Sequence, residues 1–170
     1  MSPHDVRHSG DDVVLDRTDV AIVRALQEDA RRTNRDLAAT VRLSPSACLE
    51  RVRRLVTTGV IRGYHAAVDP ESVGIGLEVL LMVRLQRHTR TTIEAFQQHC
   101  DGLEEVIHWW HLTGDSDYVL HLAVRDHEHL RAFLMDSFTT RPEIAQLATH
   151  VVLARNDEPR WPLWPRTPAS

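Results

Sequence analysis

The sequence predicts an α+β protein in which an N-terminal winged helix-turn-helix is joined by a hinge to a βαββαβ ferredoxin-like domain. Three observations predict this fold class. The first third of the chain contains three helical patterns with very short turns between them. Beyond Gly76, runs rich in Val and Leu alternate with two further helical patterns. A length of 170 residues is enough for two small domains.

The composition divides the chain into five segments. They are a flexible N-terminal arm (residues 1–14), the winged helix-turn-helix (15–66), a hinge (67–76), the ferredoxin-like domain (77–155) and a mobile Pro-rich tail (156–170). The arm lacks the apolar core of a signal peptide, and the longest apolar run, residues 79–83, is too short to span a membrane. We therefore expect a cytoplasmic protein.

The first two helices are close together in the sequence. Asp16 is suited to cap a helix whose apolar residues recur at helical spacing and which ends near Asp29. Asn34 is the expected N-cap of a short helix over residues 35–41. Only two residues then precede Ser44, and helices connected by so short a turn form a helix-turn-helix.

The third helix is the candidate DNA-binding element. Ser44 is suited to its N-cap and Pro45 to its first helical position. One face is apolar and is expected to be buried; it carries Cys48, Val52, Leu55 and Val56. The other face combines short polar side chains, which suit base edges, with guanidinium groups, which suit phosphates. The residues expected to contact DNA are Ser44, Ser46, Ala47, Glu50, Arg51, Arg53 and Arg54.

A wing is expected after this helix. Gly59 is placed as the C-terminal cap of the helix. Apolar residues between Val60 and Val68 suggest a short strand or ribbon that leads away from it. Together these features indicate the winged variant of the helix-turn-helix.

The charge distribution makes double-stranded DNA the expected partner of the first domain. Between Leu15 and His65, ten Arg stand against six acidic residues, a net charge of +4, whereas the whole chain has a net charge of −4. Binding to a polyanion is therefore expected in the first domain only. The alternative is that the Arg residues form an ordinary solvated helix face, but capping, turn length and charge together favour DNA binding.

The second half predicts four strands and two helices. The strands are expected over residues 77–85, 106–112, 118–124 and 147–153, and the helices over residues 91–99 and 127–138. This order gives an antiparallel sheet with both helices on one face. A second copy of the chain is the simplest cover for the other face.

Several motifs carry a resemblance to a known family. They are Leu15-Asp16-Arg17-Thr18-Asp19, Leu43-Ser44-Pro45, Leu49-Glu50-Arg51-Val52-Arg53-Arg54-Leu55, Gly59-Val60-Ile61-Arg62-Gly63-Tyr64 and Thr113-Gly114-Asp115-Ser116-Asp117-Tyr118. With these motifs the chain, over about residues 15–155, resembles the Lrp/AsnC family of leucine-responsive or feast/famine regulators. The resemblance implies a sequence-specific transcriptional regulator that assembles into dimers and larger rings such as octamers.

The resemblance also implies that an amino acid or related metabolite binds between dimers and modulates assembly or operator binding. The residues expected at this effector site are His111, Thr113, Gly114, Asp115, Asp117, His127 and His150. Gly114 permits a tight turn, and either Asp could accept a hydrogen bond from a ligand ammonium. Alternatively, the two Asp satisfy turn amides. The resemblance favours the ligand role for Asp117 and leaves Asp115 open.

Four departures from the family pattern are visible. Arg42 stands where the family usually has Gly, and a left-handed backbone there would cost about 1 kcal/mol. Ser116 replaces a common aromatic between the two Asp, which would open the pocket mouth. Pro142-Glu143 replaces a Pro-Gly turn. His111, His127 and His150 stand where apolar or aromatic residues are common, which points to an effector other than a branched aliphatic amino acid.

No cofactor and no metal site within one chain are expected. His127 and His129 are two apart on a predicted helix, and His108 and His111 are three apart on a predicted strand, so each pair diverges. A metal site across a dimer interface, or pH-dependent assembly through His, stays open. The two cysteines, Cys48 and Cys100, are expected to be reduced and packed.

The sequence leaves two alternatives to a specific regulator. An architectural protein that wraps DNA with little sequence preference would differ in specificity ratio and salt dependence and not in fold. An enzyme resembling the siroheme decarboxylases is disfavoured, because the Gly114-Asp115-Ser116-Asp117 loop is intact and the Tyr/Arg/His pattern associated with those enzymes is absent around residues 106–119. We therefore expect no enzymatic activity.

Overall fold

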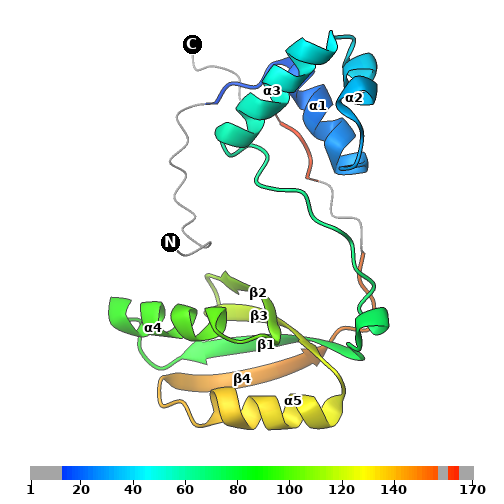
Figure 1. Ribbon diagram of the computed structural model, residues 1–170. Helices are drawn as coiled ribbons and strands as arrows, with labels where there is room; N and C mark the ends of the chain where they lie inside the picture. The colour runs from blue at the N-terminus through cyan, green and yellow to red at the C-terminus, as the bar shows by residue number, and fades with distance from the viewer. Residues whose placement is uncertain (1–12, 157–160, 165–170) are drawn as a thin grey trace. The chain divides into compact units, whose positions relative to one another are not determined.

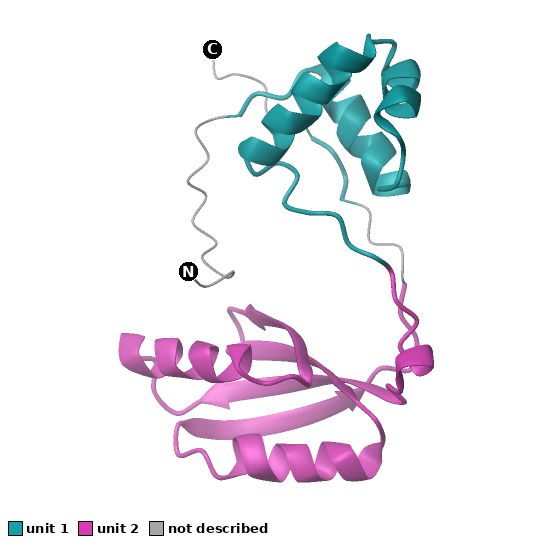
Figure 2. Cartoon of the chain, in the orientation of Figure 1, with its two compact units in different colours: residues 1–66, 158–170 teal, residues 67–157 magenta. Residues whose placement is uncertain are grey.

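The computed structural model describes residues 13–156 and 161–164. The chain forms two compact units (Figure 2): unit 1 takes residues 1–66 and 158–170, and unit 2 takes residues 67–157. The chain therefore passes from one unit to the other twice. Most of the predicted N-terminal arm and much of the predicted tail lie outside the described residues. No helix within the described ranges is long and apolar enough to cross a membrane.

Unit 1 contains three helices, α1 (Arg17–Glu28), α2 (Asn34–Val41) and α3 (Pro45–Thr57) (Figure 1). The expected N-caps of α1 and α3 are confirmed: the Asp16 carboxylate accepts from the Asp19 amide at 2.8 Å, and the Ser44 hydroxyl accepts from the Ala47 amide at 3.3 Å. The expected N-cap of α2 is wrong by one residue. Thr33 caps this helix by accepting from the Asp36 amide at 3.2 Å.

Asn34 is thereby free for another role. As the first residue of α2, it donates from Nδ2 to the Pro45 carbonyl at 2.7 Å and so ties α2 to the start of α3. Between these helices, Arg42 has φ 57° and ψ 44°, and it is the one non-glycine residue of positive φ in the described chain. The Leu43 amide donates to Ala38 O at 2.9 Å across this turn. The left-handed turn is thus retained although Gly is absent.

The core of unit 1 lies between its three helices. Its buried apolar residues are Ile22, Ala25, Leu37, Ala38, Cys48 and Leu55. Of the expected apolar face of α3, Cys48 and Leu55 are buried and Val52 is half-buried. Val56 is 45% exposed, so its assignment to the buried face is wrong. The buried face of α3 is therefore narrower than the sequence pattern predicts.

The expected wing is absent from the described structure. Thr58 is the C-cap of α3, and Gly59 follows it in the left-handed conformation at φ +73°. Among the described residues, none between Gly59 and Pro70 belongs to a strand. A ribbon needs a second strand to pair with, and the described part of unit 1 offers none. Val60 and Ile61 instead pack against the core of unit 1.

Unit 2 confirms the βαββαβ order. Its elements are a short 3-10 helix η1 (Glu71–Val73), β1 (Leu77–Leu85), α4 (Arg90–Asp101), β2 (Val106–His111), β3 (Tyr118–Val124), α5 (His127–Leu134), a π-helix η2 (Met135–Thr139) and β4 (Ile144–Val151). The sheet is antiparallel with strand order β2-β3-β1-β4. β1 and β3 match the predicted ranges, whereas β4 starts three residues earlier than expected, and the helix predicted to reach residue 138 ends as a π-helix.

The two faces of this sheet differ. Along β1 and β3, alternate residues are buried and form one core with Phe96 and Cys100 of α4 and with Leu130 and Phe133 of α5. Both helices of unit 2 therefore cover the same face (Figure 1). The second face carries the intervening residues, among them Leu80, Met82 and Val119, and the exposed Trp110 pairs with Val119 there.

Candidate DNA-binding surface and effector loop

The outer face of α3 presents most of the predicted DNA contacts. Ser44, Ser46, Glu50, Arg53 and Arg54 are exposed, and Ala47 and Arg51 are half-buried. The predicted residues thus run along α3 from its N-cap Ser44 to Arg54 in its last turn, with their side chains at least partly accessible.

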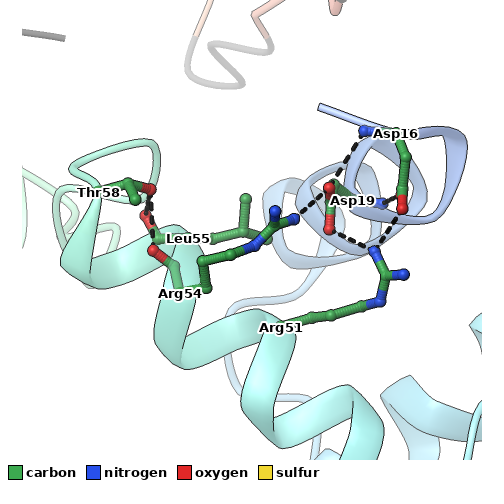
Figure 3. Close-up of polar contacts among 6 residues, drawn as sticks. All are labelled: Asp16, Asp19, Arg51, Arg54, Leu55 and Thr58. Atoms are coloured by element: carbon green, nitrogen blue, oxygen red, sulfur yellow. Dashed lines mark hydrogen bonds and ion pairs between the residues drawn. The ribbon is translucent and has the colours of Figure 1, made fainter. Parts of the chain in front are cut away.

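Two of the three arginines on this face are bound to α1. Arg51 Nη1 lies 2.9 Å from Asp19 Oδ1 and 2.6 Å from Asp16 Oδ2 (Figure 3). Arg54 Nη2 donates to Asp19 Oδ2. The Asp19 side chain is 1% exposed, so its carboxylate is a buried charge that both guanidinium groups compensate. We call these four residues the arginine–aspartate cluster.

The cluster also uses the backbone at the start of α1. The Asp16 amide donates to Asp19 Oδ2 at 3.1 Å, which completes a reciprocal capping box with the Asp19 amide. The hydrogen bond from that Asp19 amide, with the one from Arg51, holds the pKa of Asp16 below its usual value. Hydrogen bonds to Asp16 and Asp19 raise the pKa of Arg51. Asp16 and Arg51 are therefore both charged at neutral pH.

Sequence reasoning missed this cluster. It treated Asp19 only as part of a family motif and Arg51 and Arg54 only as DNA contacts. A signal was present, because Asp16 and Asp19 are three apart at a helix start and Arg51 and Arg54 are three apart on α3, so each pair shares a helix face. That these two helix faces contact each other is visible only in the tertiary structure.

Arg53 differs from its neighbours. It is exposed, and within the described residues its side chain makes no hydrogen bond or ion pair. Arg51 and Arg54 keep 32% and 47% of their side-chain surface exposed, so each still presents outer donors although one face of the guanidinium is engaged. Of the three arginines, Arg53 is therefore the one whose whole guanidinium is free for a phosphate or a base.

The loop between β2 and β3 holds the second predicted site. Gly114 has φ +125°, a conformation that favours glycine, and Leu112 N donates to Asp117 O at 2.8 Å to close the loop. The Asp117 carboxylate is engaged on both oxygens: Oδ2 accepts from the Leu85 amide at 2.7 Å, and Oδ1 lies 2.7 Å from His88 Nε2. Asp117 thus ties the loop to the end of β1.

The protonation of Asp117 follows from these contacts. Burial raises the pKa of its carboxyl, but the hydrogen bonds from the Leu85 amide and from His88 outweigh that effect and leave the pKa below the usual value. Asp117 thus binds a backbone amide, as the alternative expected, but that amide belongs to Leu85 at the end of β1 and not to the turn itself.

Asp115 lies in a different setting. It lines a hollow of about 150 Å³ together with Met82, Arg84, Ser116, Gln146 and Ala148. A guanidinium and a carboxylate therefore border one small space, on the second face of the sheet. Such a pair is complementary to the carboxylate and the ammonium of a free amino acid.

The three predicted effector histidines are not brought together within one chain. His111, the last residue of β2, stacks on Tyr118, the first residue of β3, with ring centroids 4.6 Å apart and an interplanar angle of 9°. His127 begins α5, just beyond the other end of β3. His150 pairs with Leu80 on the second face of the sheet.

The described residues contain no group of three or more His, Cys, Asp or Glu side chains that would hold a metal ion. Cys48 and Cys100 are both free and buried, as expected. Burial raises the pKa of the Cys100 thiol to about 12, which leaves it protonated and unreactive.

Comparison with known proteins identifies both units. Residues 15–56 match the AsnC-type helix-turn-helix domain, and residues 78–162 match the Lrp/AsnC ligand binding domain. The chain belongs to the Lrp/AsnC family. It is a DNA-binding transcriptional regulator with a ligand-binding domain. The predicted family is confirmed, and so is the predicted fold class of a helix-turn-helix followed by a ferredoxin-like domain, apart from the wing.

Relatives are similar over most of their length. The HTH-type transcriptional regulator AldR of Mycolicibacterium smegmatis is 39% identical over 151 residues, covering 89% of this chain and 86% of AldR. The transcriptional regulator AzlB of Bacillus subtilis is 37% identical over 142 residues, covering 84% of this chain and 90% of AzlB. The crystal structure of a Neisseria meningitidis transcriptional regulator in complex with L-Met has a TM-score of 0.77 at 34% identity, covering 82% of this chain and 90% of that one.

Proposed function

We propose that this regulator recognises operator DNA with the outer face of α3 and that Arg53 supplies its principal cationic contact. The observation that carries this assignment is the difference between Arg53, whose guanidinium is free, and its neighbours in the arginine–aspartate cluster. Helix-turn-helix proteins place the N-terminal part of the second helix against base edges in the major groove. Ser46, Ala47 and Glu50 occupy that part of α3.

Arg53→Ala tests this assignment. Because each neutralised phosphate contributes about 0.9 to the slope of log K against log salt, loss of one phosphate contact should flatten that slope by about 0.9. Arg87→Ala, an exposed arginine in unit 2, is the matched control and should leave binding unchanged. If Arg53→Ala binds with the parental affinity and slope, α3 contacts DNA through other residues. A specific to non-specific affinity ratio near one in the parent would instead favour an architectural role.

We propose an amino acid as the effector and the hollow beside Asp115 as its site. Arg84 and Asp115 offer opposite charges across the hollow, and a structural relative of 34% identity is described in complex with L-Met. A thermal-shift screen of amino acids and their keto acids against the parent and Asp115→Asn tests the site, since a ligand raises stability by mass action. A ligand whose shift is lost in Asp115→Asn supports it, and a shift that persists places the ligand elsewhere.

We also propose that a second copy of the chain covers the second face of the sheet. Apolar Leu80, Met82 and Val119 lie there beside Trp110, which is 46% exposed. Light scattering should show a dimer or larger assembly for the parent and smaller particles for Val119→Arg. Arg131→Glu, on exposed α5 surface, is the control. We expect this assembly to bind DNA in the cytoplasm and to have no enzymatic activity.

A further inference from the structure

Unit 1 contains an apolar groove that its three helices do not fill. The groove lies between α1 and the segment that follows α3, has a volume of about 590 Å³, and is lined by apolar side chains that include Leu15, Val23, Leu26, Val60 and Ile61. Trp161 and Leu163, from the far end of the chain, line the same groove. The helix-turn-helix is therefore completed by residues from outside its own sequence segment.

Trp161 is held through its backbone. Trp161 N donates to Gln27 Oε1 at 2.7 Å, and Gln27 Nε2 donates to Trp161 O at 3.3 Å. The amide side chain of Gln27, in the last turn of α1, thus pairs with the donor and the acceptor of one residue, as a neighbouring strand would. This contact fixes the position of Trp161 whatever its side chain is.

The side chains of residues 161–164 differ in how much they are buried. Leu163 is half-buried and also lines a second hollow against Arg24, Gln27 and Glu28 of α1. Trp161 and Trp164 are 76% and 83% exposed. Leu163 is therefore the apolar anchor, and Trp164 adds little to the contact.

We propose that residues 161–164 are the chain's own ligand for the α1 groove and that they stabilise the DNA-binding unit. The effect reaches α3 through α1, because α1 carries the Asp19 carboxylate that holds Arg51 and Arg54. The proposal concerns stability of unit 1 and does not depend on which residues contact DNA or on the effector.

Hydrogen exchange on the full chain tests the contact. Gln27→Ala removes both hydrogen bonds, and Leu163→Asp places a charge in the groove; each should speed exchange of the α1 amides about threefold to tenfold, with β1 and β3 unchanged. Gln98→Ala, an exposed glutamine on α4, and Trp164→Ala are the matched controls and should exchange like the parent. Parental exchange of α1 in both test variants would overturn the proposal.

Cross-linking identifies the occupant. A full chain carrying Arg24→Cys and Trp161→Cys, two positions that line the same hollow, keeps Gln27 and is treated with a short bismaleimide, while the native thiols of Cys48 and Cys100 are shielded by burial. A cross-linked product of monomer mass supports the groove's own chain as occupant. A product of dimer mass would assign the groove to the segment of a second copy. If the double variant gave no more product than the single variants, the groove would not hold the segment. Either of these two results overturns the proposal.

Discussion

At the scale of single residues, Asp19 determines how α3 is held. Its carboxylate is buried, and burial of a charge is unfavourable unless partners compensate it. Here the partners are Arg51 and Arg54, which sequence reasoning assigned to DNA alone. The same guanidinium groups thus stabilise the fold on one side and remain available to phosphates on the other.

Asp19→Asn should destabilise unit 1 by about 1–2 kcal/mol. The amide keeps the size of the side chain but leaves Arg54 without its carboxylate partner and Arg51 with Asp16 alone, and the partial exposure of both guanidinium groups lets water compensate some of the loss. Urea unfolding measures the change, with Asp136→Asn on exposed surface of unit 2 as the control. Equal stability of Asp19→Asn and the parent would show that the cluster is energetically neutral.

Arg42→Gly should stabilise unit 1 by up to about 1 kcal/mol. Arg42 adopts a left-handed backbone that disfavours residues with a side chain, and Gly relieves this cost even after its greater entropy in the unfolded chain. Arg35→Gly, at an exposed position inside α2, should destabilise by a similar amount and serves as the opposite control. Thermal unfolding that moved in one direction for both variants would contradict the strain.

At the scale of elements, the sequence predicted correctly those helices and strands whose position depends on neighbouring residues. Ser44 and Pro45 start α3 because a hydroxyl cap and a proline suit those positions. Runs rich in Val and Leu predicted β1 and β3, whose residues are alternately buried in the structure, as in a sheet with one covered face. The wing was predicted wrongly, because strand propensity in residues 60–68 has no partner strand to pair with in the described part of unit 1. The N-cap of α2 was missed because Thr33 and Asn34 are both good caps.

The effector loop shows the limit of the same reasoning. The motif around Gly114 predicted a turn with two carboxylates, and that turn is present. Which carboxylate is free depends on Leu85 and His88, residues about 30 positions away in the sequence that reach Asp117 and not Asp115. The turn and its two carboxylates were thus predictable from the sequence, but which carboxylate the fold engages was not.

The lowered pKa of Asp117 makes unit 2 sensitive to acid. A carboxyl whose folded-state pKa lies below its unfolded value of about 3.9 contributes stability above that pH, and the contribution is lost as pH falls through the folded pKa. The free energy of unfolding should therefore fall as the pH drops below about 4 and through the folded-state pKa, and Asp117→Asn should flatten that fall. Chemical denaturation across this range measures both, and identical pH profiles for the two proteins would exclude Asp117 as the cause.

At the scale of the whole molecule, two separate cores predict separate unfolding. Unit 1 and unit 2 each bury their own apolar residues, and proteins with several domains commonly unfold in more than one step. Calorimetry should resolve two transitions, with Asp19→Asn lowering the midpoint of one and Asp117→Asn that of the other. A single transition displaced by both substitutions would show that the units unfold as one cooperative block.

The return of residues 161–164 to unit 1 has a consequence for synthesis. The ribosome makes the three helices first, but the segment that fills the α1 groove follows residue 66 by roughly 95 residues. At about 5–20 residues per second, the nascent domain waits roughly 5–20 s with its apolar groove open to chaperones and neighbouring chains. The first domain to be translated is therefore the last to be completed, and a message truncated near its end would yield a regulator weakened in its DNA-binding half.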